Sequence, residues 1–223
     1  MKPILAFDVY GTLVDPMGMA DLLAPDAGQA AESVSAQWRE KQLEFSFRKG
    51  LMRMYEDFGA CTRQALRYAM ASHGLSLSGE REDELMGAYL SLPAFDDSLP
   101  ALESLQGEYR MFAFSNGTYP ALEKVLGHNH LLDQFEGLVS VDDIKSFKPD
   151  PAVYAYARRA TGAMDKPLCL VSSNAWDVIG ARAAGLTAIW VQRDAGKVFE
   201  DWGVEPNAVV RSLSELPATL DNL

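Results

Sequence analysis

The stretch KPILAFDVYGTLVD, residues 2–15, decides the fold. Residues 4–7 form a short, continuous apolar run that turn residues end, which predicts a buried β-strand. Asp8 follows at the carboxyl end of that strand, and Gly11 and Thr12 come next. In an open α/β sheet, ligands bind at the carboxyl ends of the strands, so Asp8 is placed for chemistry. The alternative is that Asp8 only caps a turn or a helix, and this segment alone does not separate the two.

Composition restricts the class of protein. The chain has 223 residues, of which 48% are hydrophobic and 23% charged, as in ordinary soluble globular proteins. No window is long and apolar enough for a membrane span, and the first apolar run is too short for a signal-peptide core. Cys61 and Cys169 are far apart and have no metal-binding spacing, and Cys169 lies in an apolar run. We therefore expect a cytoplasmic protein without a membrane partner.

The charge balance bears on the partners. The formal net charge is −11, and a nucleic-acid-binding surface needs clustered Lys and Arg, so no nucleic-acid partner is expected. If the substrate is an anion, the long-range field does not attract it. A few local cations must then provide that attraction.

The chain divides into a helical part and an alternating part. Residues 15–95 contain no convincing strand, and apolar periodicity predicts helices at residues 31–47, 61–73 and 80–90. From residue 100 the chain alternates strand and helix. The predicted strands are 111–114, 138–141, 168–171, 188–191 and 208–210. Such alternation predicts an α/β fold, a Rossmann-like core with a mostly parallel sheet (residues 1–14 and 96–223), interrupted by a helical insertion (residues 15–95).

Polar residues follow four of the predicted strands. They are Asp8 and Thr12 after the first, Ser115 and Asn116 after the second, Lys148 after the third, and Ser172 to Asp177 after the fourth. Parallel strands place their carboxyl ends on one edge of the sheet, so these side chains should converge. The convergence of four such ends predicts a functional site there.

Each of these residues also has a structural interpretation. Lys148 could be a solvated loop lysine, but beside Asp8 it would keep that carboxylate ionised, and an ionised, partly desolvated carboxylate can act as a nucleophile. Ser115 and Asn116 could bind a substrate carboxylate or merely cap the following helix. Asp177 could be a capping acid or a second acid that faces Asp8.

Four further residues are ambiguous on pattern alone. Arg39 stands among charged neighbours and has the pattern of a solvated helix face. Phe58 and Trp176 have the pattern of core or interface aromatics. Tyr154 should pack on its helix, with a hydroxyl that could reach Lys148 or an acid.

Four segments together resemble the motifs of the haloacid dehalogenase-like hydrolases. They are DVYGTLV (residues 8–14), SNG (115–117), KP (148–149) and the acid-bearing loop that ends at Asp177. Their order and spacing fit over the whole chain. The resemblance implies that residues 15–95 form the helical cap domain of this superfamily.

Two positions depart from the phosphatases of the superfamily. Phosphatases carry a second Asp two positions after the nucleophile, where this chain has Tyr10, and an acid that helps to hold magnesium, where it has Ser173. Magnesium prefers carboxylate oxygens, so Ser173 argues against a metal and against phosphoryl transfer. The alternatives are a magnesium-dependent phosphatase or phosphonatase with altered motifs, and a catalytically silent binding protein with the same fold.

Two segments narrow the resemblance. SSNAWD (residues 172–177) and WREKQLE (38–44) are similar to signatures of the L-2-haloacid dehalogenases, the type II subfamily. This implies hydrolysis of short anionic (S)-2-haloacids to (R)-2-hydroxy acids and halide, with no cofactor and no metal, through an ester on Asp8. Members are commonly homodimers, so a homodimer is expected.

The resemblance also implies a role for each matched residue. Asp8 attacks C2 of the substrate, Arg39 holds the departing halide, and Asp177 positions or activates the hydrolytic water. Lys148 orients and ionises Asp8, and the supporting residues are Thr12, Tyr154, Ser172 and Asn174. The substrate carboxylate binds to Ser115, Asn116 and the backbone at Val9 and Tyr10. The apolar wall around C2 consists of Tyr10, Leu43, Phe58 and Trp176.

Overall fold

A parallel sheet forms the centre of the molecule in the computed structural model, which describes residues 2–223. Within that range the sheet has six strands in the order β3-β2-β1-β4-β5-β6. They are β1 (Ile4–Phe7), β2 (Met111–Ser115), β3 (Gly137–Ser140), β4 (Leu168–Ser172), β5 (Thr187–Val191) and β6 (Ala208–Val210). Every neighbouring pair is parallel. The predicted α/β fold is confirmed, and each strand lies within one residue of its predicted position.

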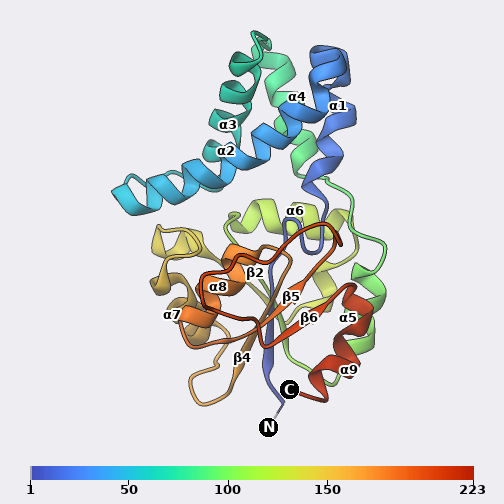
Figure 1. The fold of residues 1–223 in the computed structure, drawn as a ribbon, viewed down its shortest axis with the longest axis vertical. Coiled ribbons are helices and arrows are strands. Elements are labelled where there is room, and N and C mark those ends of the chain that lie inside the picture. Colours follow the sequence, from blue (N-terminus) through green and yellow to red (C-terminus); the bar gives the residue numbers. More distant parts are fainter. Residues whose placement is uncertain (1) are drawn as a thin grey trace.

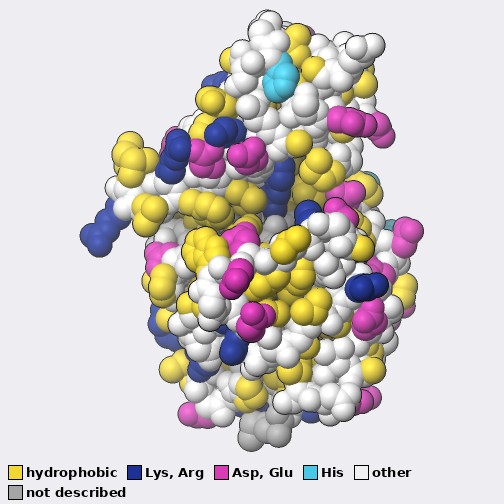
Figure 2. All heavy atoms as spheres, in the orientation of Figure 1, with side chains coloured by type: hydrophobic (Ala, Val, Ile, Leu, Met, Phe, Trp, Pro, Cys, Tyr) yellow, Lys and Arg dark blue, Asp and Glu magenta, His cyan; other side chains and the backbone are white. Residues whose placement is uncertain are grey.

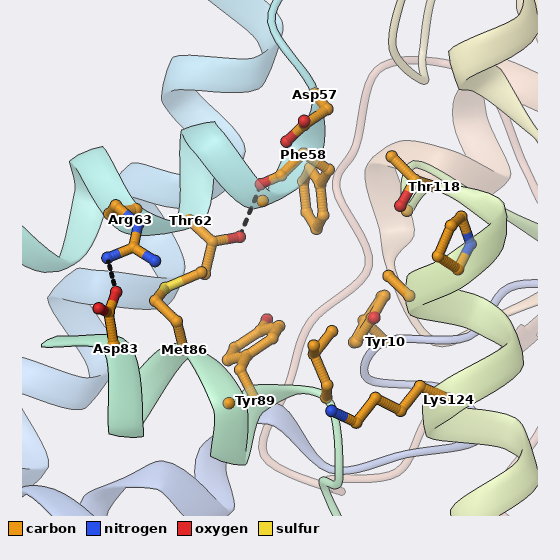
Figure 3. A pocket seen from close by; sticks show the side chains of 16 residues that line it. Tyr10, Asp57, Phe58, Thr62, Arg63, Asp83, Met86, Tyr89, Thr118 and Lys124 are labelled. Atoms are coloured by element: carbon orange, nitrogen blue, oxygen red, sulfur yellow. Dashed lines mark hydrogen bonds and ion pairs between the residues drawn. The ribbon is translucent and has the colours of Figure 1, made fainter. Parts of the chain in front are cut away.

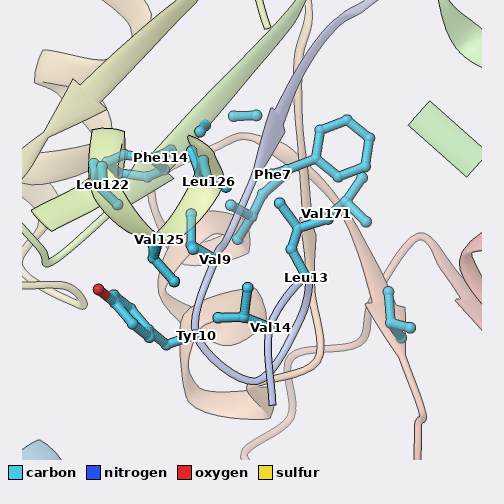
Figure 4. Packing of buried hydrophobic residues seen from close by; sticks show 14 of the residues in the cluster. Phe7, Val9, Tyr10, Leu13, Val14, Phe114, Leu122, Val125, Leu126 and Val171 are labelled. Carbon is cyan, nitrogen blue, oxygen red and sulfur yellow. The ribbon is translucent and has the colours of Figure 1, made fainter. Parts of the chain in front are cut away.

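The opening stretch supplies the central strand. β1 pairs with β2 on one side and with β4 on the other, and Phe7 lies opposite Ala113 and Val171. All four residues of β1 are buried, as expected for a strand whose two faces are both covered. Figure 4 shows side chains from this strand and the loop after it packed against those of β2 and α6. Asp8 therefore directly follows a buried strand that is paired on both sides.

Helices cover both faces of the sheet. They are α5 (Ser98–Leu105), α6 (Tyr119–His128), α7 (Pro151–Ala160), α8 (Ala175–Ala183) and α9 (Leu216–Leu220). α7 packs on α8 and α5 packs on α9, and Figure 1 shows the two pairs on opposite sides of the strands. Short 3₁₀ turns lie at Pro16–Gly18, Gly28–Ala30, Leu132–Gln134, Val141–Ile144 and Leu213–Glu215.

Four helices form a separate layer, here called the helical unit. They are α1 (Met19–Ala27), α2 (Ala31–Met52), α3 (Phe58–Ser72) and α4 (Gly79–Tyr89). Figure 1 shows them at the end of the molecule far from both termini, with α2 extending sideways beyond the sheet. Side chains start two of them: Asp57 accepts from the backbone N–H of Ala60 at α3, and Ser78 from that of Arg81 at α4.

Two chain crossings join the helical unit to the sheet. The outgoing and returning segments pair at Val14 and Ala94 in an antiparallel bridge. The N–H of Asp15 donates to the carbonyl of Pro93 at 2.9 Å, and that of Phe95 to the carbonyl of Leu13 at 3.0 Å. The helical unit is thus tied to the sheet by one narrow double connection, beside the loop that carries Asp8.

The helices differ from the predicted ones in several places. α2 extends five residues beyond the predicted 31–47, and this projecting end lacks the apolar periodicity by which a packed helix is predicted. α1, α5 and α9 were not predicted, and α1 contains Pro25, which is unfavourable inside a helix. Among the helices in residues 2–223, none has the length and apolar character needed to cross a bilayer.

Candidate active site

The two oxygens of Asp8 have unequal surroundings. Oδ2 accepts hydrogen bonds from Asn174 Nδ2 at 2.7 Å, Thr12 Oγ1 at 2.8 Å and Ser172 Oγ at 3.2 Å. Oδ1 accepts one, from Lys148 Nζ at 3.2 Å. The carboxylate is 5% exposed. Three donors therefore saturate Oδ2, whereas Oδ1 keeps a free lone pair for chemistry.

The loop around Asp8 fixes the direction of those hydrogen bonds. Thr12 Oγ1 accepts from the backbone N–H of Ser173 at 2.9 Å, and Ser172 Oγ accepts from that of Asn174 at 3.1 Å. Each hydroxyl has one proton, which is then directed at Asp8. We call the residues around Asp8 at the carboxyl ends of the strands the floor of the site. The floor consequently presents three donors to one carboxylate oxygen, those of Thr12, Ser172 and Asn174.

Lys148 joins the two acids of the floor. It is fully buried, and Nζ donates to Asp177 Oδ2 at 2.8 Å, to the carbonyl of Phe114 at 2.9 Å and to Asp8 Oδ1 at 3.2 Å. Burial by itself lowers the pKa of Lys148, but the negative charges of Asp177 and Asp8 outweigh it and leave that pKa raised. Lys148 is therefore a permanent cation, and it is no solvated loop lysine.

Asp177 lies in the first turn of α8 and is completely buried. Oδ1 accepts from the Tyr154 hydroxyl at 2.8 Å, while the N-cap of α8 is Asn174. Burial raises the pKa of Asp177, and the nearby Asp8 raises it further, against the opposing effects of Lys148 and Tyr154. The interpretation of Asp177 as only a capping acid is wrong.

Close packing of α7 on α8 places Tyr154 at Asp177. A Cβ atom on Gly180 would lie 2.5 Å from the Tyr154 hydroxyl and 2.7 Å from Pro149 Cβ. Only glycine permits this approach. The predicted contact of Tyr154 with an acid is present. Gly180 makes this contact possible, and no sequence pattern had indicated its role.

Two side chains at the carboxyl end of β2 have protons without an acceptor among the described residues. Ser115 Oγ accepts from the N–H of Gly117 at 3.1 Å, and Asn116 Oδ1 accepts from that of Lys148 at 2.9 Å. Among the described residues, the Ser115 hydroxyl proton and the Asn116 amide protons have no protein acceptor. Neither residue caps α6, whose N-cap is Thr118. The capping alternative is therefore wrong, and both residues present free donors.

Backbone donors lie next to them. In the described chain, the N–H groups of Val9 and Tyr10 have no acceptor, whereas those of Gly11 and Thr12 bond to the carbonyls of Val14 and Val9. Gly11 has a φ of 90°, which bends the loop back over the strand end. The side chain of Val9 is buried in the core (Figure 4), so only its backbone belongs to the site.

The helical unit contributes a cation to the site. Arg39 lies on α2 and is half-buried; Nη1 donates to Gln42 Oε1 at 2.6 Å and Nη2 to the carbonyl of Tyr10 at 3.2 Å. No carboxylate of residues 2–223 forms an ion pair with Arg39. Pattern alone indicated a solvated residue, which is wrong. Gln42 was missed, although its spacing of three from Arg39 on a helix allows contact.

Floor and helical unit enclose a cavity of about 10 Å³. Its lining consists of Asp8, Tyr10, Arg39, Leu43, Phe58, Ser115, Asn116, Asn174 and Trp176. All nine were predicted site residues. Five other predicted residues do not line the cavity. Thr12, Lys148 and Ser172 hydrogen-bond to Asp8, whereas Asp177 and Tyr154 are connected to it through Lys148. The aromatic walls are themselves braced, since Tyr10 packs on Phe58 and Trp176 on Phe47.

Larger cavities lie on two sides of this one. A cavity of about 490 Å³ between the helical unit and α6 shares Tyr10 and Phe58 with it (Figure 3). Another, of about 430 Å³, shares Arg39 and Asn174. Hydrophobic side chains also gather along the boundary between the helical unit and the sheet (Figure 2). The small cavity thus shares part of its wall with two larger ones.

A lysine ammonium lies between the two acids of the site. Asp8 and Asp177 are bridged by the ammonium of Lys148, and Ser173, at the position of the metal-holding acid in phosphatases, is bound to the carbonyl of Gly11. Over residues 2–223, no group of three or more His, Cys, Asp or Glu side chains is arranged to hold a metal ion.

Comparison with known proteins agrees with this geometry. The family model of the haloacid dehalogenase-like hydrolases matches residues 3–185. The chain belongs to this family. An (S)-2-haloacid dehalogenase of Pseudomonas sp. (strain YL) is 38% identical over 213 residues, which cover 94% of this chain and 90% of that protein. One of Pseudomonas fluorescens is 36% identical over 217 residues, with coverage of 97% and 95%.

A solved structure resembles this hydrolase over its whole length. The L-2-haloacid dehalogenase of Xanthobacter autotrophicus, with chloropropionic acid covalently bound, superimposes with a TM-score of 0.93 at 29% identity. The match covers 100% of both chains. The helical unit and the sheet are thus both present in that relative.

Proposed function

We propose that this hydrolase converts short (S)-2-haloacids into (R)-2-hydroxy acids and halide through an ester on Asp8. One observation carries the proposal: Asp8, with a free lone pair on Oδ1, and Arg39, without a carboxylate partner, line the same small cavity. The relatives at 36–38% identity named (S)-2-haloacid dehalogenase support it.

The first step is a displacement at C2. The substrate carboxylate is held by the Ser115 hydroxyl, the Asn116 amide and the N–H groups of residues 9 and 10, whose protons are free. Asp8 Oδ1 attacks C2, a C–O bond forms, and the halide leaves with the electron pair of the broken C–X bond toward Arg39. Attack from the sheet and departure toward the helical unit give the in-line geometry that the reaction needs.

The surroundings make the carboxylate reactive. A hydrated carboxylate is a poor nucleophile, and a closed apolar site removes its water. Leu43, Phe58 and Trp176 supply that apolar wall. Lys148 orients Asp8 through a buried ion pair.

The second step hydrolyses the ester. Water attacks the carboxyl carbon of Asp8, and negative charge develops on Oδ2, to which Thr12, Ser172 and Asn174 already donate. Donors in place before the charge develops stabilise it without reorganisation. Asp177 accepts the proton of the water, as its raised pKa favours. The hydroxy acid then leaves with Oδ1, and the net products are hydroxy acid, halide and one proton.

We propose that residues 15–95 act as a cap domain over a catalytic core of residues 1–14 and 96–223. The cap brings Arg39 and the apolar wall to the core. We also propose that no metal takes part. Tyr10 replaces the acid that would protonate an alcohol leaving group, and a halide needs no proton.

The surroundings of the protein in the cell are part of the proposal. A net charge of −11 disfavours a nucleic-acid partner. Two buried, unpaired cysteines, Cys61 and Cys169, fit the reducing cytoplasm.

A homodimer is proposed on the exposed apolar side chains near the projecting end of α2. Leu51 is 87% exposed, Met52 58% and Met54 64%, and Figure 2 shows hydrophobic side chains at that end. Exposed apolar surface of this kind favours association. Size-exclusion chromatography with light scattering should give twice the chain mass, and a single-chain mass at all concentrations would rule out the dimer.

One assay tests the proposed reaction. Halide release is measured from (S)- and (R)-2-chloropropionate in the presence of excess chelator. We expect release from the S enantiomer alone, unaffected by the chelator, with (R)-lactate as the product. Absence of release from both enantiomers by folded protein would reject the function, and loss of release on chelation would point to a metal-dependent hydrolase.

A further inference from the structure

A buried glutamine beside Arg39 accepts a hydrogen bond from its guanidinium. Gln42 lies one turn further along α2, is 1% exposed, and does not line the small cavity. Its Oε1 accepts from Arg39 Nη1 at 2.6 Å and from the Tyr89 hydroxyl at 3.0 Å. Gln42 therefore has no direct contact with the contents of the cavity, and Arg39 is the charged group through which it can act on them.

The hydrogen-bond chain admits only one orientation of the Gln42 amide. A guanidinium only donates, so Oε1 must face Arg39, and Nε2 then faces Thr62 Oγ1 at 2.5 Å. Thr62 in turn donates to the carbonyl of Phe58 at 2.7 Å. Three helices, α2, α3 and α4, thus fix one amide group, and the chain ends at the aromatic wall of the site.

Every partner of Arg39 in this network is neutral. Burial raises the pKa of Tyr89, so its hydroxyl stays protonated and adds no negative charge. The other acceptor of Arg39 is a backbone carbonyl, that of Tyr10. A carboxylate in place of Gln42 would have the same shape and hydrogen-bond more strongly, but it would neutralise the cation.

We propose that Gln42 is a positioning residue that orients Arg39 with a neutral acceptor, so that the positive charge of Arg39 remains available to the anion in the site. Gln42 fixes the guanidinium without supplying a counterion. This inference rests on the proposed function for the identity of the anion, a halide. It requires only that Arg39 binds an anion, which can be measured without turnover.

The substitution Gln42→Glu separates charge from shape. The new carboxylate can accept from Arg39 and Tyr89 and, after rotation of the hydroxyl, from Thr62, so the fold should be kept. Its negative charge beside Arg39 should weaken chloride binding about 10- to 100-fold, the size of effect that one adjacent opposite charge produces. Gln29→Glu, on the exposed surface of the helical unit, makes the same charge change as a matched control.

Chloride binding is read from the broadening of the ³⁵Cl NMR signal, with Arg39→Met defining the part that depends on Arg39. We expect the chloride concentration needed for that part to rise about 10- to 100-fold in Gln42→Glu and to stay the same in Gln29→Glu. The thermal unfolding of both variants should stay near that of the wild type. In turnover, Gln42→Glu should lower kcat for (S)-2-chloropropionate far more than it changes KM. Wild-type chloride binding and kcat in folded Gln42→Glu would overturn the proposal.

A second variant keeps the test decisive if Gln42→Glu does not fold. Thr62→Val preserves shape but removes the acceptor of Gln42 Nε2, so the amide can rotate away from Arg39. We expect a smaller fall in kcat and weaker Arg39-dependent chloride broadening, and unchanged values would also overturn the proposal. If the wild type binds chloride through Arg39 but releases no halide from any haloacid, the proposed function fails while the role of Gln42 stands.

Discussion

The site contains two cations that the protein holds in opposite ways. Lys148, in the sheet, donates all three of its protons, two of them to carboxylates. Arg39, in the helical unit, donates to a side-chain amide and a backbone carbonyl, both neutral. Lys148 is therefore compensated, and Arg39 is not. The net charge of the chain is −11. Arg39 can nevertheless attract an anion to the site, because no carboxylate among residues 2–223 neutralises it.

The largest expected effect concerns the sheet side of this comparison. Asp8→Asn removes the nucleophile but keeps the shape of the side chain. We expect kcat for halide release to fall about 10⁴-fold or more, because the covalent step is lost. The exposed Asp165→Asn is the control, and similar activities for the two variants would exclude Asp8 as the nucleophile.

The second-largest expected effect is on stability, to which Lys148 should contribute and Arg39 should not. Lys148→Met leaves two buried carboxylates, Asp8 and Asp177, without their partner. The free energy of unfolding should drop by about 3–5 kcal/mol, the usual consequence of breaking a buried pair. Urea denaturation measures it, with the exposed Lys145→Met as control. An unchanged midpoint for Lys148→Met would mean that the floor does not depend on its cation.

Arg39→Met should show the reverse pattern. No carboxylate loses a partner, so the free energy of unfolding should stay the same or rise. The value of kcat/KM should fall about 10²- to 10³-fold, as when one preorganised donor is removed from a site. Arg48→Met, on the same helix and paired with Glu44 at the surface, is the control. Strong destabilisation by Arg39→Met, with activity retained, would show that Arg39 stabilises the fold as Lys148 does and does not serve the reaction.

The smallest effect is a shift in pH dependence. Burial raises the pKa of Asp177, and the hydrogen bond from Tyr154 partly counteracts this. Tyr154→Phe therefore raises that pKa further. The active form needs ionised Asp177, so activity is present above this pKa and is lost as pH falls through it.

The acid limb of the kcat profile should accordingly move to higher pH in Tyr154→Phe. Tyr156→Phe, two residues along α7 with its hydroxyl on Asp143, should leave the limb in place. A limb that moves to lower pH, or does not move, would show that Asp177 does not titrate in the rate-limiting step.

The two sides of the site also differ in how far the sequence predicts them. The sheet side follows from local rules, since parallel strands with polar ends must bring Asp8, Lys148 and Asp177 to one edge. Arg39 could not be placed by pattern, because its neighbours Glu40 and Lys41 on α2 are charged, as on a solvated helix face. Its role came from resemblance to a family.

What the sequence could not show depends on packing between helices. The contact of Gln42 with Thr62 and Tyr89 exists because α3 and α4 pack beside α2, a matter of tertiary geometry. The same holds for Gly180, whose missing side chain matters only because α7 lies against α8.

An isotope experiment tests most directly the claim that Asp8 attacks carbon and that water attacks Asp8. One turnover is run in H₂¹⁸O with enzyme in excess over (S)-2-chloropropionate. The masses of the product and of the peptide that contains Asp8 are then measured by mass spectrometry. We expect an unlabelled lactate hydroxyl and one ¹⁸O in the Asp8 carboxylate. Labelled lactate with an unlabelled Asp8 peptide would mean that water attacks C2 directly and that Asp8 is not the nucleophile.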